Sequence, residues 1–127
     1  MRGVTYDSGA LIAADRNDRA MWALHAGFLA EEVAPTVPAP VLAEAWRGGS
    51  RQANLARFLA LCTIEDLTEE QAKGVGVLAG KSGHDDIVDV TVVEGAMRRH
   101  DAVVTADPGH IRAIADAVRA RVRIETV

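Results

Sequence analysis

Residues 85–108 read DDIVDVTVVEGAMRRHDAVVTADP, and this stretch decides the fold class. Positions 85–99 predict a helix, and Ala102–Thr105 is a short apolar run typical of a buried strand. Asp107-Pro108 then predicts the start of another helix, because Asp is a preferred N-cap and Pro is tolerated in a first turn. A helix, a strand and a helix in succession indicate an α/β protein with a parallel sheet.

The rest of the chain continues this alternation. Thr68 and Gln71 have the spacing of a capping box, and Pro38 and Pro40 are placed to open a helix. We expect a three-layer α/β/α fold in which a central parallel sheet is flanked by helices and ligands bind beyond the carboxyl ends of the strands. The expected strands are 3–6, 33–37, 63–67, 102–105 and 122–125. One helix is expected to begin near residue 10, and the others to cover 19–30, 38–48, 51–62, 68–81, 85–99 and 107–118.

Length and composition indicate one domain over residues 1–127. No apolar run is long enough for a bilayer and MRGVTYD lacks the apolar region of a signal peptide, so we expect a cytoplasmic protein. Cys62, at helical spacing from Phe58, is expected to be a reduced core residue. A net charge of −4 argues against binding nucleic acid through bulk charge, so any such contact must be local.

Four carboxylates predict a divalent-metal site. Asp7 and Asp107 each follow an expected strand, which places both at the same edge of the sheet. Asp89 lies in an apolar stretch, where a carboxylate is costly to bury unless it is paired or binds a cation. Glu44 lies in a helix between apolar neighbours. Convergent carboxylates are the ligands that Mg²⁺ and Mn²⁺ prefer.

Each acid also has an ordinary structural explanation. Asp7 and Asp107 fit the pattern of helix N-caps, and Glu44 fits a solvated helix position. Asp86 shares a helix face with Asp89, where like charges repel, but it also fits an acid placed near a helix N-terminus. These alternatives stay open at the level of sequence.

The order of these motifs resembles a known family. Asp7 follows an N-terminal strand, Glu44 lies in PVLAEAW, Asp89 in DIVDVTVV and Asp107 in VVTADP, and together they resemble PIN-domain proteins, specifically VapC-type toxins of prokaryotic toxin–antitoxin pairs. The interval of 18 positions between Asp89 and Asp107 and the closing VVTADP are the most specific parts (107 − 89 = 18). The likeness covers the whole chain.

That resemblance implies a PIN-like fold and a metal-dependent endoribonuclease with Asp7, Glu44, Asp89 and Asp107 at the family's acidic positions, using Mg²⁺ or Mn²⁺. It also implies a homodimer and a cognate antitoxin with a segment over the active-site groove. After Asp89 the chain reads VTVVEGA instead of the Ala-rich run usual in the family, so the subgroup and the RNA that is cut are not indicated.

Several neighbouring side chains are candidate helpers. Asp86 and Thr105 are expected around the acidic ligands, where Thr105 would donate a hydrogen bond to a carboxylate or a water. His84 and His110 could touch substrate, but a role at helix ends is favoured, and His25 and His100 are expected at helix surfaces or boundaries. Basic residues are expected to contact RNA phosphates or an acidic antitoxin tail, unless they are ordinary solvated charges: Arg47, Arg51, Arg98 and Arg99.

Other kinds of protein fit less well. The segment 74–82 resembles a phosphate-binding loop, but the required Gly is replaced by Val75, so a Gly-rich helix end packed on a neighbour is expected. A receiver domain would need adjacent acids after the first strand and a late Lys, and the only lysines are Lys73 and Lys81. The remaining alternative is an inactive PIN-like scaffold that binds protein or RNA without cutting it.

Overall fold

The computed structural model describes residues 3–127, so positions 1 and 2 of the predicted domain lie outside the described residues. Within them, a five-stranded sheet has the order β3-β2-β1-β4-β5, and all neighbouring strands are parallel. The central parallel sheet is therefore confirmed. The strands are β1 Val4–Tyr6, β2 Thr36–Pro38, β3 Thr63–Glu65, β4 Ala102–Thr105 and β5 Ile124–Thr126.

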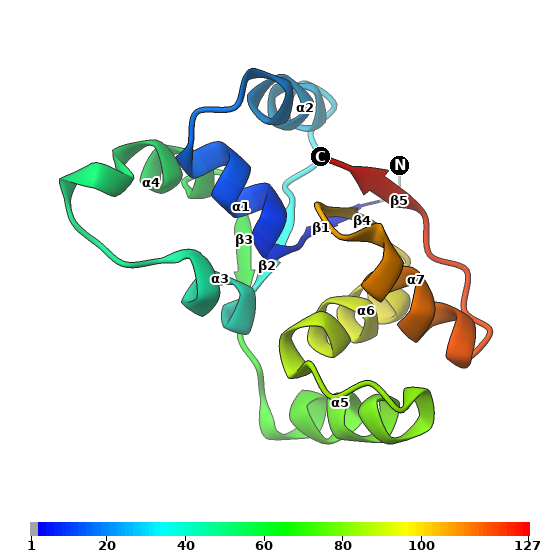
Figure 1. Cartoon of the computed structure of the whole chain (residues 1–127). Coiled ribbons are helices and arrows are strands. Elements are labelled where there is room, and N and C mark those ends of the chain that lie inside the picture. Colours follow the sequence, from blue (N-terminus) through cyan, green and yellow to red (C-terminus); the bar gives the residue numbers. More distant parts are fainter. Residues whose placement is uncertain (1–2) are drawn as a thin grey trace.

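Helices cover both faces of the sheet, as expected for three layers (Figure 1). One group consists of α1, which contacts β1 and β4, with α2 and α4 beside it; the other consists of α6, which contacts β1, β2 and β4, with α5 and α7 beside it. The short α3 lies between the groups and contacts both α1 and α6. The helices are α1 Ser8–Asp15, α2 Arg19–Ala30, α3 Ala39–Ala45, the 3₁₀ turn η1 Ser50–Gln52, α4 Ala53–Leu59, α5 Glu69–Ser82, α6 Ile87–Arg99 and α7 Pro108–Ala117.

The core centres on β1 and β4, whose side chains are buried on both faces of the sheet. On one face the hydroxyl of Tyr6 hydrogen-bonds Nδ1 of His25 at 2.8 Å, and the His25 ring stacks on Phe58 with centroids 4.0 Å apart. The expectation that His25 lies at a helix surface or boundary is wrong, because a buried tyrosine hydroxyl needs a partner and His25 supplies it. Burial lowers the pKa of His25. Cys62 packs against this core, and burial raises its thiol pKa to about 12.

The segment after α3 differs from the expected helices. The helix ends at Ala45, before Gly48 and Gly49, which both take positive φ. The amide of Gln52 replaces the helical hydrogen bonds here: its oxygen accepts from the backbone N–H groups of Arg47 and Gly48, and its nitrogen donates to the carbonyl of Ala45. The expected helix 38–48 therefore ends early, at Ala45, and the expected helix 51–62 is reduced to α4, which ends at Leu59.

The expected capping box is present at the start of α5, where Thr68 and Gln71 satisfy each other's backbone N–H groups. The glycine-rich segment 74–82 continues this helix, so it forms no phosphate-binding loop. The expectation of close packing there is wrong for Gly74, Gly76 and Gly80, since a Cβ at each would meet nothing within 4 Å. Among the described helices, none combines the length and apolar character needed to cross a bilayer.

Candidate metal centre

The N-termini of α1, α6 and α7 are each capped by an aspartate: Asp7, Asp86 and Asp107. Because α1 follows β1 and α7 follows β4, two of these caps lie at the carboxyl edge of neighbouring parallel strands. The structural role that the sequence left open for these acids is thus present. The positive ends of the helix dipoles also stabilise carboxylate charge at this edge.

Asp7 is buried and held on both carboxylate oxygens. Its Oδ1 accepts the backbone N–H of Ser8 at 2.8 Å, and its Oδ2 accepts the hydroxyl of Thr105 at 2.8 Å. Gly9 makes this approach possible, because a Cβ there would lie 2.5 Å from the Cβ of Ala106 and 2.8 Å from its backbone nitrogen. A glycine is therefore required where α1 meets the chain after β4.

Thr105 connects Asp7 to Asp107. While its hydroxyl donates to Asp7, the same oxygen accepts the backbone N–H of Asp107 at 2.9 Å. Thr105 thus makes the carboxylate hydrogen bond expected from the sequence, although its part in binding a metal remains a prediction. The Asp107 carboxylate itself stays largely open to solvent, with its side chain 59% exposed.

Asp89 lies in the first turn of α6 with its side chain only 15% exposed. Burial raises the pKa of this carboxyl, and the nearby charges of Asp7 and Asp86 raise it further, whereas His110 and His84 lower it. The charge of Asp7 therefore opposes ionisation of the Asp89 carboxyl. A bound cation would relieve this repulsion. Asp86 also holds the turn, since its Oδ1 accepts the N–H groups of Val88 and Asp89.

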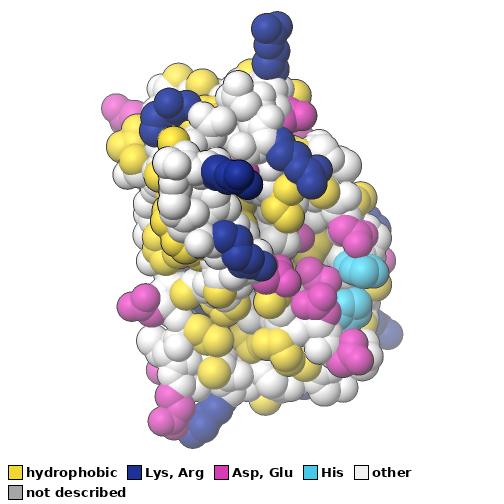
Figure 2. Space-filling model, turned by 60° about the vertical axis from the view of Figure 1, so that its left-hand side comes forward, with side chains coloured by type: hydrophobic (Ala, Val, Ile, Leu, Met, Phe, Trp, Pro, Cys, Tyr) yellow, Lys and Arg dark blue, Asp and Glu magenta, His cyan; other side chains and the backbone are white. Residues whose placement is uncertain are grey.

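Two histidines converge on Asp89. His84 Nε2 lies 3.7 Å and His110 Nδ1 lies 3.3 Å from the Asp89 Oδ2, and His110 Nδ1 is also 3.1 Å from the Asp107 Oδ2. Figure 2 shows acidic side chains gathered beside two histidines on one face. Both are at helix ends, as favoured from the sequence, but their convergence on Asp89 was missed. The signal available was that His84 precedes the cap of α6 and His110 lies three positions after Asp107.

Glu44 stands apart from these contacts. It lies in α3, which packs on α1 and α6, but its side chain is exposed. Its apolar neighbours Leu42 and Ala45 are partly buried and pack against the core, whereas Trp46 lies beyond the helix with 41% exposure. The part of Glu44 in binding a metal remains a prediction. Among residues 3–127, the potential ligand atoms that lie within 4.8 Å of one another come from His84, Asp89 and His110, and this group includes none of Asp7, Glu44 and Asp107.

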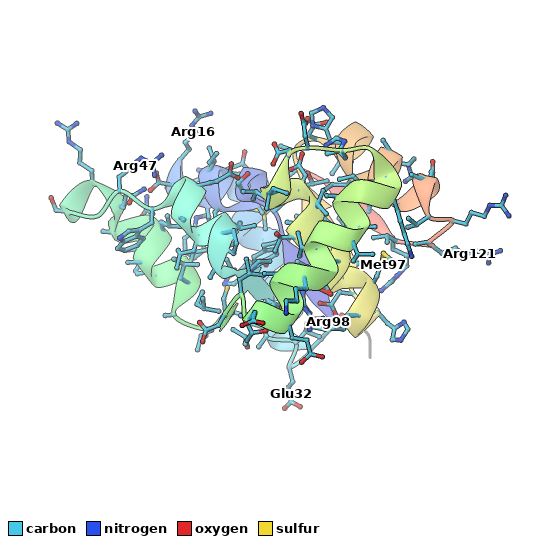
Figure 3. The ribbon with its side chains drawn as sticks, turned by 90° about the horizontal axis from the view of Figure 1, so that it is seen from below. Arg16, Glu32, Arg47, Met97, Arg98 and Arg121 are labelled. Atoms are coloured by element: carbon cyan, nitrogen blue, oxygen red, sulfur yellow. The ribbon has the colours of Figure 1, made fainter. Side chains whose placement is uncertain are left out.

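The four arginines fall into two pairs. Arg47 lies in the loop after α3, where its guanidinium donates to the carbonyls of Ala43 and Trp46, and Arg51 is exposed in η1. Arg98 and Arg99 lie at the other end of α6 from Asp89. Figure 3 shows Arg47 on the same side of the molecule as Arg16, well away from Arg98.

Arg98 and Arg99 are engaged in ion pairs within the chain. Arg98 binds Glu65 at 2.8 Å and Glu94 at 2.9 Å, and Arg99 binds Glu65 at 2.7 Å and Asp101 at 3.0 Å. The expectation that these arginines contact RNA or an antitoxin stays a prediction. The ion pairs show a structural use for the same charges.

The carboxylates at this edge are of the chemical kind that a hard divalent cation prefers. Asp7, Asp89 and Asp107 offer carboxylate oxygens from three elements, linked through Thr105 and His110. Mg²⁺ and Mn²⁺ accept such an open set because they keep several waters as ligands. Burial, followed by the charges of Asp7 and Asp86, raises the pKa of Asp89, and a bound cation would offset these effects.

The strand order, the helical layers and the acids at the carboxyl edge define a PIN-like α/β/α fold. The chain is similar in structure to a chain of the VapBC2 complex of Rickettsia felis, solved with a DNA fragment from its promoter, with a TM-score of 0.73, 16% identity and 98% of each chain covered. It is also similar to a chain of the DNA-bound VapBC complex of Salmonella typhimurium, with a TM-score of 0.71, 19% identity, and 99% of this chain and 98% of that one covered.

A scan of protein-family models finds no match to this chain, and a search of curated proteins also finds none. The resemblance seen in the sequence is thus confirmed at the level of the fold. The likeness extends over nearly the whole chain.

Proposed function

We propose that this chain is a metal-dependent endoribonuclease and the toxin of a type II toxin–antitoxin pair. The observation that carries the proposal is that Thr105 links Asp7 to the backbone of Asp107 at the carboxyl edge of the sheet, while His110 lies 3.3 Å from Asp89 and 3.1 Å from Asp107. The similarity in fold to chains of VapBC complexes supports it.

In this proposal Asp7 and Asp89 hold Mg²⁺ or Mn²⁺ directly. Asp107 and Glu44 complete the ligand set directly or through water, and Thr105 fixes the orientation of the Asp7 carboxylate. Asp86 caps α6 and adds negative charge beside Asp89. The bound ion supplies polarisation of the scissile phosphate and a lowered pKa of the attacking water.

The proposed partners are a cognate antitoxin, an RNA substrate and a second copy of the chain. Because the net charge is −4, RNA phosphates must be met by local basic groups, for which Arg47, Arg51, Arg98 and Arg99 are the candidates. Arg47 and Arg51 are the stronger candidates for phosphate contacts, since Arg98 and Arg99 are already paired with acids.

A second candidate function is that of a PIN-like scaffold that binds its partner without cutting RNA. One observation favours it: Asp7, Asp86 and Asp107 each cap a helix, so these acids have a use without a metal. Asp89 is the acid that distinguishes the two functions, because its side chain caps no helix. Burial raises the pKa of this carboxyl.

Incubation of the purified chain with labelled RNA, with Mg²⁺, with Mn²⁺ or with chelator, tests the proposal. Asp89→Asn keeps the side-chain volume but removes a ligand charge, so we expect cleavage to fall by about 100-fold or more with the fold intact by circular dichroism. The matched control is Asp116→Asn on the exposed side of α7, which should cleave as wild type.

Equal cleavage by Asp89→Asn and wild type would remove Asp89 from the centre. If the wild-type chain binds RNA or its antitoxin but cuts no RNA with either metal, the scaffold function is correct. Sequencing the 5′ ends of RNA fragments after brief induction of the wild-type chain would identify the substrate and the position of the cut.

A further inference from the structure

The histidines beside the acidic centre come from separate elements. His84 lies in the turn between α5 and α6, Asp89 in the first turn of α6, and His110 in the first turn of α7. Helix α6 packs against α7, which brings the three side chains together. Their arrangement thus depends on the tertiary fold and not on spacing within one helix.

The three side chains present a compact donor set. One ligand atom from each lies within 4.8 Å of the other two, and the two distances to Asp89 Oδ2 are 3.7 Å from His84 and 3.3 Å from His110. Ligands about 2.1 Å from a tetrahedral ion stand about 3.4 Å apart, so small side-chain rotations are sufficient. The two imidazole rings lie edge to face, with centroids 5.5 Å apart, so neither ring stacks over the other.

Access and chemistry both suit an ion from solution. The His110 side chain is 58% exposed and that of His84 is 22% exposed, while Asp89 forms the more buried base of the group. Imidazole nitrogen is a poor ligand for Mg²⁺ and a good one for Zn²⁺ and Co²⁺, with affinity rising from Mn²⁺ through Co²⁺. Two imidazoles and one carboxylate leave a fourth position for water or substrate.

We propose that His84, Asp89 and His110 form a binding site for a divalent transition-metal ion that prefers imidazole ligands, such as Zn²⁺ or Co²⁺. This inference rests on the proposed function in one respect only: Asp89 is a ligand in both proposed metal sites. Because Asp89 belongs to both sets of ligands, an ion bound by the histidines competes with Mg²⁺ for that carboxylate.

Titration of the purified, untagged chain with Co²⁺ tests the inference without any RNA. Nitrogen-bound Co²⁺ gives visible absorption, and we expect a saturable signal with one equivalent that millimolar Mg²⁺ leaves in place and Zn²⁺ displaces. His84→Gln and His110→Gln should each weaken Co²⁺ binding by at least tenfold. The matched control is His100→Asn, whose position has a φ of 59° that Asn tolerates, and it should bind Co²⁺ as wild type.

A wild-type chain without this signal, or a signal unchanged in both histidine variants, would overturn the inference. Thermal unfolding of each variant checks the fold, and His84→Asn and His110→Asn provide a second pair should either Gln variant unfold early. The two proposals fail separately: RNA cleavage with Mg²⁺ but no histidine-dependent Co²⁺ signal rejects only the histidine site. The opposite result rejects only the nuclease.

Discussion

The hydroxyl of Thr105 joins the two strand ends that build the acidic edge. It donates to Asp7 and accepts from the backbone N–H of Asp107, and the residue is fully buried. Thr91 offers a contrast: its hydroxyl, also in a buried residue, donates to the carbonyl of Ile87 within α6. The hydroxyl of Thr105 thus links separate elements, whereas that of Thr91 bonds within its own helix.

Thr105→Val is expected to lower the free energy of unfolding by about 1–3 kcal/mol, because it removes the hydrogen-bond partner of the Asp107 N–H and of the Asp7 Oδ2. Thr91→Val has the same change in shape and should cost less, since the helix already satisfies the Ile87 carbonyl. Urea unfolding of both variants measures the difference. Equal losses would mean that the Thr105 hydroxyl does not organise the edge.

The residues of the candidate site differ in how well the sequence predicts their positions. Asp7 and Asp107 follow strands and Thr105 ends one, so their shared edge was predictable from the alternation of elements alone. The meeting of His84 with His110 was not, because it depends on how α7 packs on α6, which no local pattern encodes. The sequence left open whether Glu44 is solvated, and its side chain is exposed; its part in binding a metal remains a prediction.

At the level of elements, a cluster of ion pairs ties the end of α6 to the sheet. Glu65 at the end of β3 binds Arg98 and Arg99, and Arg99 also binds Asp101 and the hydroxyl of Thr5. Hydrogen bonding from Arg98, followed by that from Arg99, lowers the pKa of Glu65 below its ordinary value of 4.5. The cluster connects the edge strand β3 to the central strand β1.

Glu65→Gln is expected to lower the free energy of unfolding at pH 7 by about 1 kcal/mol, since partial exposure screens the lost charge pairs. A lowered pKa gives stability that is full above 4.5 and is lost as pH falls through the folded-state pKa, so the difference from wild type should shrink below about pH 4.5. Denaturant unfolding from about pH 3 to about pH 7 measures this difference, since that interval covers the ordinary titration of a carboxyl group near pH 4 and the plateau above it.

Glu94→Gln is the matched control, because Glu94 pairs with Arg98 four positions along the same helix and should cost only about 0.3–0.5 kcal/mol. A Glu65→Gln effect as small as that of Glu94→Gln, or one that is independent of pH, would contradict a role for the cluster in joining β3 to α6.

Most element positions followed from local patterns, and the failures have a tertiary cause. The bounds of α2 and β4 agree with those expected, since hydrophobic periodicity and capping signals are local. The segment 46–52 was misassigned because Gln52 satisfies backbone groups before and after two glycines, and a side chain that replaces helical hydrogen bonds leaves no periodic signal.

Across the whole molecule, the charge is uneven although the net charge is only −4. Arg47 and Arg51 follow α3, which packs beside the α1 and α6 helices that carry Asp7 and Asp89 at their N-termini. Arg121 projects from a distant part of the molecule (Figure 3). Under the proposed function, Arg47 and Arg51 are the local basic groups expected to contact RNA phosphates.

The double variant Arg47→Ala/Arg51→Ala is expected to weaken RNA and antitoxin binding. If each arginine contacts one phosphate, the slope of log K against log salt should fall by up to about 1.4, which is 2 × 0.7 for single strands. Fluorescence anisotropy in the Asp89→Asn background measures this with intact RNA. The control Arg112→Ala/Arg121→Ala removes the same charge and should leave the slope unchanged. If the Arg47→Ala/Arg51→Ala variant binds RNA and antitoxin as wild type, these two arginines do not belong to the interface.

Calorimetric titration with Mn²⁺ tests most directly whether the distant acids form one centre. We predict that Asp7→Asn, Asp89→Asn and Asp107→Asn each weaken Mn²⁺ binding by about tenfold or more, that Glu44→Gln weakens it less, and that Asp116→Asn binds as wild type. Wild-type affinity in both Asp7→Asn and Asp89→Asn would show that neither carboxylate binds the ion. That result would contradict the metal centre.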